Sequence, residues 1–238
     1  MKPFIDVRHV SLAYTLGQKL SLRPRSRTAT GGNLRTARGR SYVQALDDVS
    51  FHLTEGDRLG RVGTNGAGQS TLLKVLYGIM EPTSGTIETQ GRIDALFNIN
   101  LGFRKEASGR RNIELRGLIN GWSKAQIDAR MDEIIEFSEL GEFIDVPYKT
   151  YSQGMAARLA FSVATALEPE ILLMDEWIGA GDAKFRAKAA KRMNQVAEKA
   201  GIIVLASHDK KLIKRVCNKV LFLEKGQVKD LIPIELYE

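Results

Sequence analysis

Two kinds of hydrophobic pattern recur along the chain and predict two kinds of strand. Apolar and polar residues alternate over residues 5–10 and 49–53, which predicts half-buried strands that pair as an antiparallel edge. Other segments are short apolar runs and predict strands buried on both faces, as in a parallel sheet; these are 58–62, 171–174, 202–206 and 220–223. Helical patterns separate these segments, so the sequence predicts an α/β core.

The middle of the chain carries only helical patterns. Strand patterns are absent between about residues 103 and 167, where 124–140 and 155–167 show helical spacing. Ser123 and Ser152 stand where N-caps are expected. We therefore predict one domain over 1–238 with a core formed by 1–102 and 168–238, and an inserted helical subdomain at about 103–167.

A glycine-rich run follows the first apolar strand and opens onto a helical pattern. Its three glycines allow turns in which successive backbone N–H groups point at one anion, and the following helix N-terminus adds further N–H donors. Ser70 offers a hydroxyl to Mg2+, which prefers oxygen ligands. This order is that of a phosphate-binding loop. The run is Gly63-Thr64-Asn65-Gly66-Ala67-Gly68-Gln69-Ser70-Thr71.

Position 69 departs from the loop pattern because it holds glutamine where such loops place lysine. The lysine would contribute at most roughly 4 kcal/mol to a phosphate about 4 Å away at an effective dielectric near 20. Desolvation of the ammonium offsets much of this, and Gln69 can still donate a hydrogen bond. We expect weak nucleotide affinity and slow hydrolysis.

Two later strand patterns end in groups suited to phosphate chemistry. The segment 171–174 is followed by Asp175 and Glu176, and the segment 202–206 leads to Ser207 and His208. In an open α/β sheet, ligands bind at the carboxyl ends of the strands. We therefore expect Asp175 to hold Mg2+, Glu176 to accept a proton from an attacking water, and His208 to contact the γ phosphate.

Composition is that of a globular protein, with 43% hydrophobic and 26% charged residues in 238. The net charge of +7 comes from seven basic residues between positions 19 and 40, a stretch that has no acidic residue. We interpret residues 17–41 as a solvated or partly disordered loop insertion. A contact with an anionic membrane surface or an acidic partner is the functional alternative. Nucleic-acid binding is a weaker hypothesis because no aromatic residues interleave the basic ones.

Other features limit where the protein acts. No apolar run approaches the roughly 20 residues that span a bilayer, and the first eight residues lack the apolar core of a secretory signal. We therefore expect the chain on the cytoplasmic side. The single cysteine, Cys217, excludes an internal disulfide and is expected to be a packing residue.

Five elements in order carry a resemblance to a known family. They are the 63–71 loop, the segment Tyr151-Ser152-Gln153-Gly154-Met155, the pair Asp175-Glu176, the segment Gly179-Ala180-Gly181-Asp182, and Ser207-His208-Asp209. With these elements the chain resembles the ATP-binding subunits of ABC transporters over nearly its whole length. It is most similar to those that export O-antigen, capsule or teichoic acid. The fold implied is a P-loop NTPase (RecA-like) core with a mostly parallel sheet, an antiparallel β edge and an inserted helical subdomain.

The resemblance implies a mechanism and further site residues. Two subunits form a homodimer in which each ATP lies between the loop of one and the signature segment, Ser152 to Met155, of the other. Asp182 then joins the two sites, Tyr14 stacks on adenine, and Asn98 stands near the position of the family's glutamine between core and helical subdomain. ATP and Mg2+ are the implied ligands. The subunit would bind an integral-membrane permease at the cytoplasmic face of the inner membrane, with no nucleic acid expected.

Three hypotheses stay open at this point. The first is a working transport ATPase of a polysaccharide exporter, and the second is a nucleotide-binding subunit that hydrolyses ATP poorly because of Gln69. The third is a soluble ABC protein that acts on nucleic acid through its basic segment. The third is weakened because such proteins carry two ATP-binding halves or a long coiled coil, and this sequence has one loop motif.

Overall fold

The structure, a computed structural model, covers most of the chain. The described residues are 2–15, 33–37, 40–63, 69–97, 99, 102–166, 169–176 and 182–237, with only the backbone described at 33–37, 40–41, 69 and 183. The chain divides into two compact units. The first comprises Met1–Ala95, Glu170–Trp177 and Gly201–Glu238, and the second comprises Leu96–Pro169 and Ile178–Ala200. The second unit thus includes a segment beyond the 103–167 range expected from the sequence.

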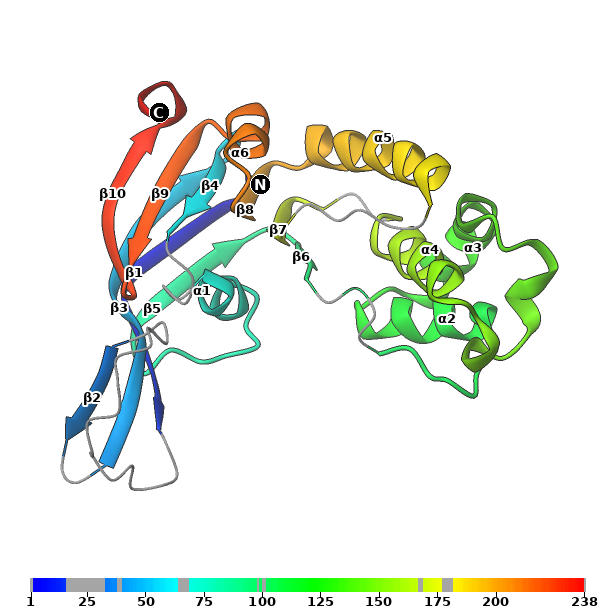
Figure 1. The fold of residues 1–238 in the computed structure, drawn as a ribbon, viewed down its shortest axis with the longest axis horizontal. Coiled ribbons are helices and arrows are strands. Elements are labelled where there is room, and N and C mark those ends of the chain that lie inside the picture. Colours follow the sequence, from blue (N-terminus) through cyan, green and yellow to red (C-terminus); the bar gives the residue numbers. More distant parts are fainter. Residues whose placement is uncertain are drawn as a thin grey trace. The chain divides into compact units, whose positions relative to one another are not determined.

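An antiparallel sheet of four strands belongs to the first unit (Figure 1). Its order is β2-β3-β1-β5, and the strands are β1 (Phe4–Thr15), β2 (Asn33–Ala37), β3 (Arg40–Thr54) and β5 (Ser84–Gln90). Ile5 pairs with Leu53 and Val10 with Val49, so the antiparallel pairing predicted from the alternating segments is confirmed. Both strands extend beyond the alternating segments, because backbone pairing continues where the pattern stops.

The prediction of a loop over residues 17–41 is wrong at its C-terminal end. Asn33–Ala37 form β2, which pairs with β3 from Asn33 opposite Gln44 to Ala37 opposite Arg40. Two residues, Arg38 and Gly39, separate the last pair in sequence, and a two-residue link with glycine is a hairpin signal. The many arginines around these residues mask the strand pattern in the sequence. The remainder of the basic segment, including Lys19, lies outside the described residues.

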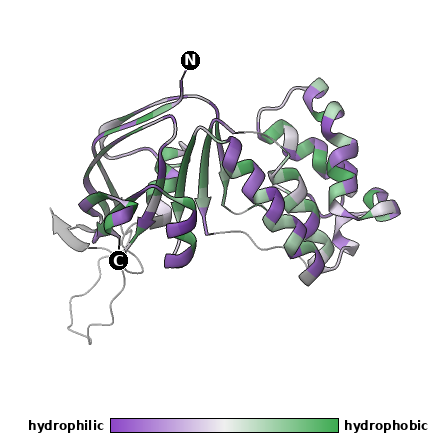
Figure 2. Cartoon of the chain, turned by 90° about the horizontal axis from the view of Figure 1, so that it is seen from above, coloured by the Kyte–Doolittle hydropathy of each residue, from purple (hydrophilic) through white to green (hydrophobic). Residues whose placement is uncertain are grey.

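The second sheet has six strands in the order β10-β9-β4-β8-β7-β6. Its strands are β4 (Arg58–Val62), β6 (Ile93–Leu96), β7 (Ile171–Asp175), β8 (Ile202–Ala206), β9 (Lys219–Glu224) and β10 (Gln227–Pro233). β4 runs parallel to β8 and β9, and β7 runs parallel to β8, whereas β10 is antiparallel to β9. Residues 202–206 are all buried, and the central strands are mostly hydrophobic (Figure 2). The predicted α/β fold with a mostly parallel sheet is confirmed.

Two helices of the first unit follow strands of this sheet. α1 (Gln69–Leu76) packs against β7 and β8, and α6 (Lys210–Val216) packs against β4. Gly60 permits the second contact, since a Cβ there would lie 2.7 Å from Cγ2 of Ile213 and 3.0 Å from Sγ of Cys217. Cys217 is buried and free, as expected for a packing residue.

The second unit is helical. Its helices are α2 (Gly109–Ile119), α3 (Lys124–Ser138), α4 (Gln153–Ala164) and α5 (Ala183–Lys199), with short 3-10 helices at Gly141–Asp145 and Tyr148–Thr150. Ser123 and Ser152 are N-caps, as predicted, and Gln126 completes a capping box with Ser123. A core that includes Ile113, Trp122 and Leu159 holds α2, α3 and α4 together. Within the described segments, no helix combines the length and the apolar character that crossing a membrane requires.

Candidate nucleotide site

The carboxyl end of β7 carries two adjacent carboxylates that differ in environment. Asp175 is the last residue of the strand and is half-buried, and Glu176 follows it with an exposed side chain. The backbone of Glu176 adopts φ 71°, a left-handed conformation that is costly for a residue with a Cβ. Its N–H donates to the carbonyl of Ala206 at 2.8 Å. The backbone of Glu176 is thus tied to the end of β8.

Glu176 lies against the segment that follows β8. Its Oε2 accepts a hydrogen bond from Oγ of Ser207 at 2.9 Å, and its Oε1 accepts one from the backbone N–H of His208 at 3.3 Å. Ser207 also accepts from the backbone N–H of Asp209 at 3.1 Å, the N-cap of α6. The structure therefore brings Glu176 and His208 together at one edge of the sheet, with the His208 side chain exposed.

The glycine-rich run connects β4 to α1, in the strand, loop and helix order predicted. Gly63 directly follows β4, and Gln69 is the first residue of α1 with only its backbone described. Thr64, Asn65, Gly66, Ala67 and Gly68 lie outside the described residues, as does Asn98. A link of five residues therefore joins Gly63 to the N-terminus of α1.

Tyr14 lies beside the start of α1. Its hydroxyl is 3.3 Å from Oγ1 of Thr71 and donates to Sδ of Met80 at 3.2 Å. Since Tyr14 belongs to β1 and Thr71 to α1, this contact fixes an aromatic side chain of the antiparallel sheet next to the helix that receives the loop. The placement fits an aromatic contact to a base bound near the loop.

Two side chains carry oxygen atoms that are suited to bind Mg2+. Ser70 stands in the first turn of α1 and Asp175 at the end of β7, and α1 packs against β7. A hydroxyl and a carboxylate are ligands that Mg2+ prefers when it shares phosphate oxygens and water. Among the described residues, no cluster of three or more His, Cys, Asp or Glu side chains could hold a metal.

Arg61 is a residue of this region that the sequence analysis missed. It lies on β4 with an exposed fraction of 0%, and none of its guanidinium nitrogens has a hydrogen-bond partner among the described residues. Burial lowers the pKa of Arg61 to about 9, and the charge of Asp175 opposes this effect. The available signal was an arginine in the middle of a strand pattern that is otherwise typical of burial on both faces.

The signature segment begins α4 in the second unit. Oγ of Ser152 accepts a hydrogen bond from the backbone N–H of Met155 at 3.2 Å, which is the N-cap interaction. Tyr151 precedes it, with its ring tilted against that of Tyr148 at 5.2 Å between ring centroids. A Cβ added to Gly154 would meet only Oγ of Ser152, at 3.8 Å. Gln153 and Gly154 are exposed, so the backbone of the first turn is open to a ligand.

Asp182 caps α5 in the same unit. Its Oδ1 accepts from the backbone N–H of Phe185 at 3.0 Å, and its Oδ2 pairs with Arg158 of α4. The hydrogen bond from the backbone of Phe185 is the main cause that holds the pKa of Asp182 below its usual value; desolvation opposes it, and the hydrogen bond from Arg158 adds to the lowering. Arg158 also donates to Glu139 at 3.3 Å. Within this unit, the structure connects the signature helix to Asp182 through Arg158.

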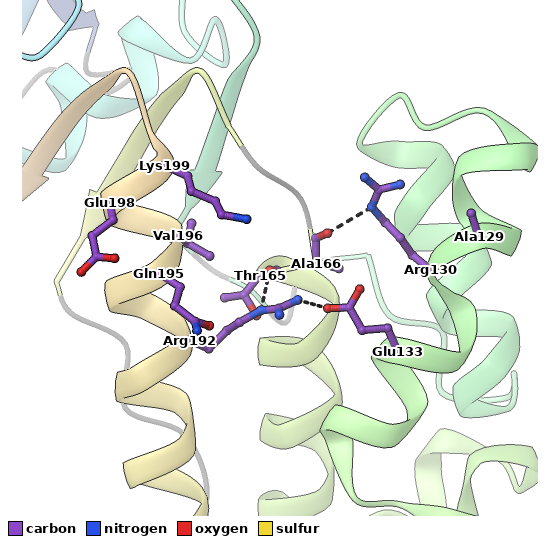
Figure 3. A pocket seen from close by; sticks show the side chains of 10 residues that line it. All are labelled: Ala129, Arg130, Glu133, Thr165, Ala166, Arg192, Gln195, Val196, Glu198 and Lys199. Carbon is purple, nitrogen blue, oxygen red and sulfur yellow. Dashed lines mark hydrogen bonds and ion pairs between the residues drawn. The ribbon is translucent and has the colours of Figure 1, made fainter.

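A cleft of about 700 Å3 in the second unit contains none of the predicted site residues (Figure 3). Arg192 donates to the carbonyl of Thr165 at 3.2 Å and pairs with Glu133, while Arg130 donates to the carbonyl of Ala166 at 3.1 Å. These arginines are thus engaged with the C-terminal end of α4 and, for Arg192, with Glu133 of α3. The cleft therefore reflects how the helices are tied together and does not add to the nucleotide site.

Comparisons with known proteins agree on one family. A family model described as ABC transporter matches residues 46–179. The O-antigen export system ATP-binding protein RfbE of Yersinia enterocolitica is 46% identical over 203 residues, which are 85% of this chain and 85% of that protein. The teichoic acids export ATP-binding protein TagH of Lactococcus lactis subsp. lactis is 36% identical over 225 residues, 94% of this chain but 47% of that protein. The chain thus spans about half the length of that relative.

A solved structure shows the same fold. The dimeric post-hydrolysis state of the ATP-binding cassette MJ0796 bound to ADP and Pi superposes with a TM-score of 0.69 at 20% identity, covering 97% of this chain and 98% of that one. At this identity the likeness shows the fold alone.

Proposed function

Because the chain belongs to the ABC transporter family, we propose that it is the ATP-binding subunit that couples ATP binding and hydrolysis to export of a cell-surface polysaccharide through a separate permease. The observation that carries the proposal is the 46% identity, over 85% of both chains, to an O-antigen export ATP-binding protein. The placement of Asp175 and Glu176 in the sheet that bears the glycine-rich link supports it.

The residues of the first unit have separate roles in the site. The 63–71 loop binds the phosphates through backbone N–H groups, and Tyr14 contacts the base. Ser70 and Asp175 hold Mg2+, which when bound neutralises charge on the phosphate oxygens. Glu176 orients and deprotonates a water, and its hydrogen bonds with Ser207 and His208 keep the carboxylate in position. His208 contacts the γ phosphate.

The second unit supplies the groups that act across a homodimer. Ser152, Gln153, Gly154 and Met155 at the open first turn of α4 contact the γ phosphate bound to the partner subunit. Asp182 links the two sites, and its bond to Arg158 ties it to the signature helix. ATP closes the dimer and hydrolysis reopens it, a population shift that drives the permease. The subunit works at the cytoplasmic face of the cell membrane without entering the bilayer.

Gln69 favours a second candidate function, a subunit that binds nucleotide and hydrolyses it slowly. A neutral side chain at that position cannot supply the positive charge that stabilises the phosphates in the transition state. In this case ATP closes the dimer and opening depends on slow turnover or exchange. Phosphate release by the chain and by Gln69→Lys separates the two candidates.

The experiment on export uses a strain that lacks the gene for this chain. Expression of the chain, of Gln69→Lys and of Glu88→Gln, an exposed control on β5, should restore surface polysaccharide, whereas Glu176→Gln should not. Fractionation should find the subunit with membranes only when the permease is present. Retention on nucleic acid in moderate salt would contradict the proposal and favour the nucleic-acid alternative. Membrane association without the permease would instead indicate that the basic segment contacts the membrane surface directly.

A further inference from the structure

Arg61 combines full burial with unused hydrogen-bonding capacity. A guanidinium carries five N–H donors, and here Nε, Nη1 and Nη2 all lack a partner among the described residues. Buried polar groups are almost always hydrogen-bonded, so each exception requires an explanation. Arg58, at the start of the same strand, is half-buried and has no such deficit. The exception therefore belongs to position 61 and not to β4 as a whole.

The register of the sheet aligns Arg61 with Asp175. Arg61 on β4 pairs with Ala206 on β8, and Ala206 pairs in turn with Asp175 on β7. Partners at one register level of a parallel sheet point to the same face. The residue between the two charges is an alanine, so only a methyl group separates their side chains along this row. α6 packs on the opposite face, where Gly60 points.

Arg61 carries a positive charge on the strand that leads into the glycine-rich loop, and the loop lacks a positive charge at position 69. The glycine-rich loop has glutamine at 69, where such loops place a lysine that brings a positive charge to the phosphates. Arg61 is eight positions upstream and lies in the same register row as Asp175. The loop lacks a positive charge at position 69, and β4 holds one that forms no hydrogen bond with a described residue.

We infer that Arg61 is the counter-cation of Asp175, taking over from the strand the charge that the loop lacks at position 69. The inference rests on the proposed function, because it concerns a nucleotide site. Arg61 acts through Asp175 and is therefore a positioning residue. With this positive charge in its row, Asp175 still serves as an Mg2+ ligand but holds the cation less tightly. Mg2+ should then add little to the affinity of this chain for ATP.

The first experiment needs no nucleotide and tests the pairing itself. The unfolding midpoint is measured for the chain, Arg61→Leu, Asp175→Asn and the double variant. Asp175→Asn should lower the midpoint by about 3 °C in the parent and by less than about 1 °C in the Arg61→Leu background. The reason is that Asp175→Asn leaves a buried cation without its counter-charge only where Arg61 is present. Arg58→Leu is the matched control and should leave the effect of Asp175→Asn unchanged. Equal shifts in both backgrounds would overturn the inference.

The second experiment measures affinity for a fluorescent ATP analogue in excess Mg2+ and in EDTA. The parent and Arg61→Lys should change less than about twofold, whereas Arg61→Leu combined with Gln69→Lys should bind about tenfold more tightly with Mg2+. A tenfold Mg2+ effect already present in the parent would overturn the inference. If no variant binds the analogue while the stability coupling is observed, the proposed function fails and the pairing of Arg61 with Asp175 stands.

Discussion

Two arginines, one in each unit, differ in how their charge is balanced. In the helical unit, Arg158 pairs with Glu139 and Asp182, and the neighbouring Lys188 also pairs with Glu139. In the sheet unit, Arg61 is fully buried with no hydrogen bond among the described residues. Satisfied, partly exposed networks hold a fold together, whereas an unsatisfied buried charge costs stability and indicates a functional role.

The largest expected effect concerns the carboxylate that follows β7. Glu176→Gln should lower the rate of phosphate release by about 10²- to 10³-fold, the contribution typical of a general base. Glu88→Gln, exposed on β5, is the control and should retain the parent rate. If Glu176→Gln leaves turnover unchanged, another group accepts the proton.

The next effect restores the charge that the loop lacks. Gln69→Lys should raise turnover by about 10-fold or more, because a cation at the phosphates stabilises the charge that is redistributed during transfer. The matched control is Gln69→Met, which keeps a similar length without charge and should not accelerate the reaction. Turnover of Gln69→Lys equal to that of the parent would show that position 69 does not limit the reaction.

The contrast between these two arginines predicts stability changes of opposite sign. Arg61→Leu should raise the free energy of unfolding by about 1–3 kcal/mol, because it removes a buried guanidinium that forms no hydrogen bond among the described residues, whereas Asp175, which loses its counter-charge, is only half-buried and keeps access to water. Arg158→Leu should lower the unfolding midpoint, since it breaks two ion pairs and a contact of the guanidinium with the Phe185 ring at 5.1 Å. Thermal unfolding followed by circular dichroism measures both. A decrease for Arg61→Leu would remove the basis of the comparison.

The smallest effect is a dependence of stability on pH. The hydrogen bond from Lys188 lowers the pKa of Glu139 below its usual 4.5, and that from Phe185 lowers the pKa of Asp182 below 3.8. Carboxylates with depressed pKa values stabilise the fold above their unfolded values, and this contribution is lost as the pH falls through the folded ones. The temperature of the unfolding midpoint should therefore decrease as the pH falls below about 4.5. Glu139→Gln with Asp182→Asn should flatten this decline; an identical decline would refute the assignment.

The sequence predicted those features that depend on local pattern. β8 matches the apolar segment 202–206 residue for residue, because a strand buried on both faces leaves a continuous hydrophobic signature. β4 matches 58–62 in the same way, although Arg58 and Arg61 interrupt its apolar residues. The N-caps Ser123 and Ser152 were found because capping is a local hydrogen bond. β2, which pairs with β3, was not predicted because residues 33–37 show little alternation of apolar and polar residues and lie among arginines.

The site was only partly predictable for a related reason. Glu176 and His208 follow strands and could be placed at one edge of the sheet from strand order alone. Arg61 could not be assigned, because its relation to Asp175 passes through Ala206 on a third strand and depends on the register of two pairings. The link between Arg158 and Asp182 likewise depends on how α4 and the start of α5 pack. The register of paired strands and the packing of distant segments cannot be read from a single sequence.

The most direct test of the account is calorimetric titration of ATP into the purified chain and into Gly68→Val, in which a branched side chain occupies the glycine-rich loop. We expect saturable binding of one nucleotide per chain, lost in Gly68→Val and retained in Arg58→Leu. Absence of saturable binding to the parent chain, or equal binding to Gly68→Val, would contradict the assignment of the loop as the phosphate-binding element.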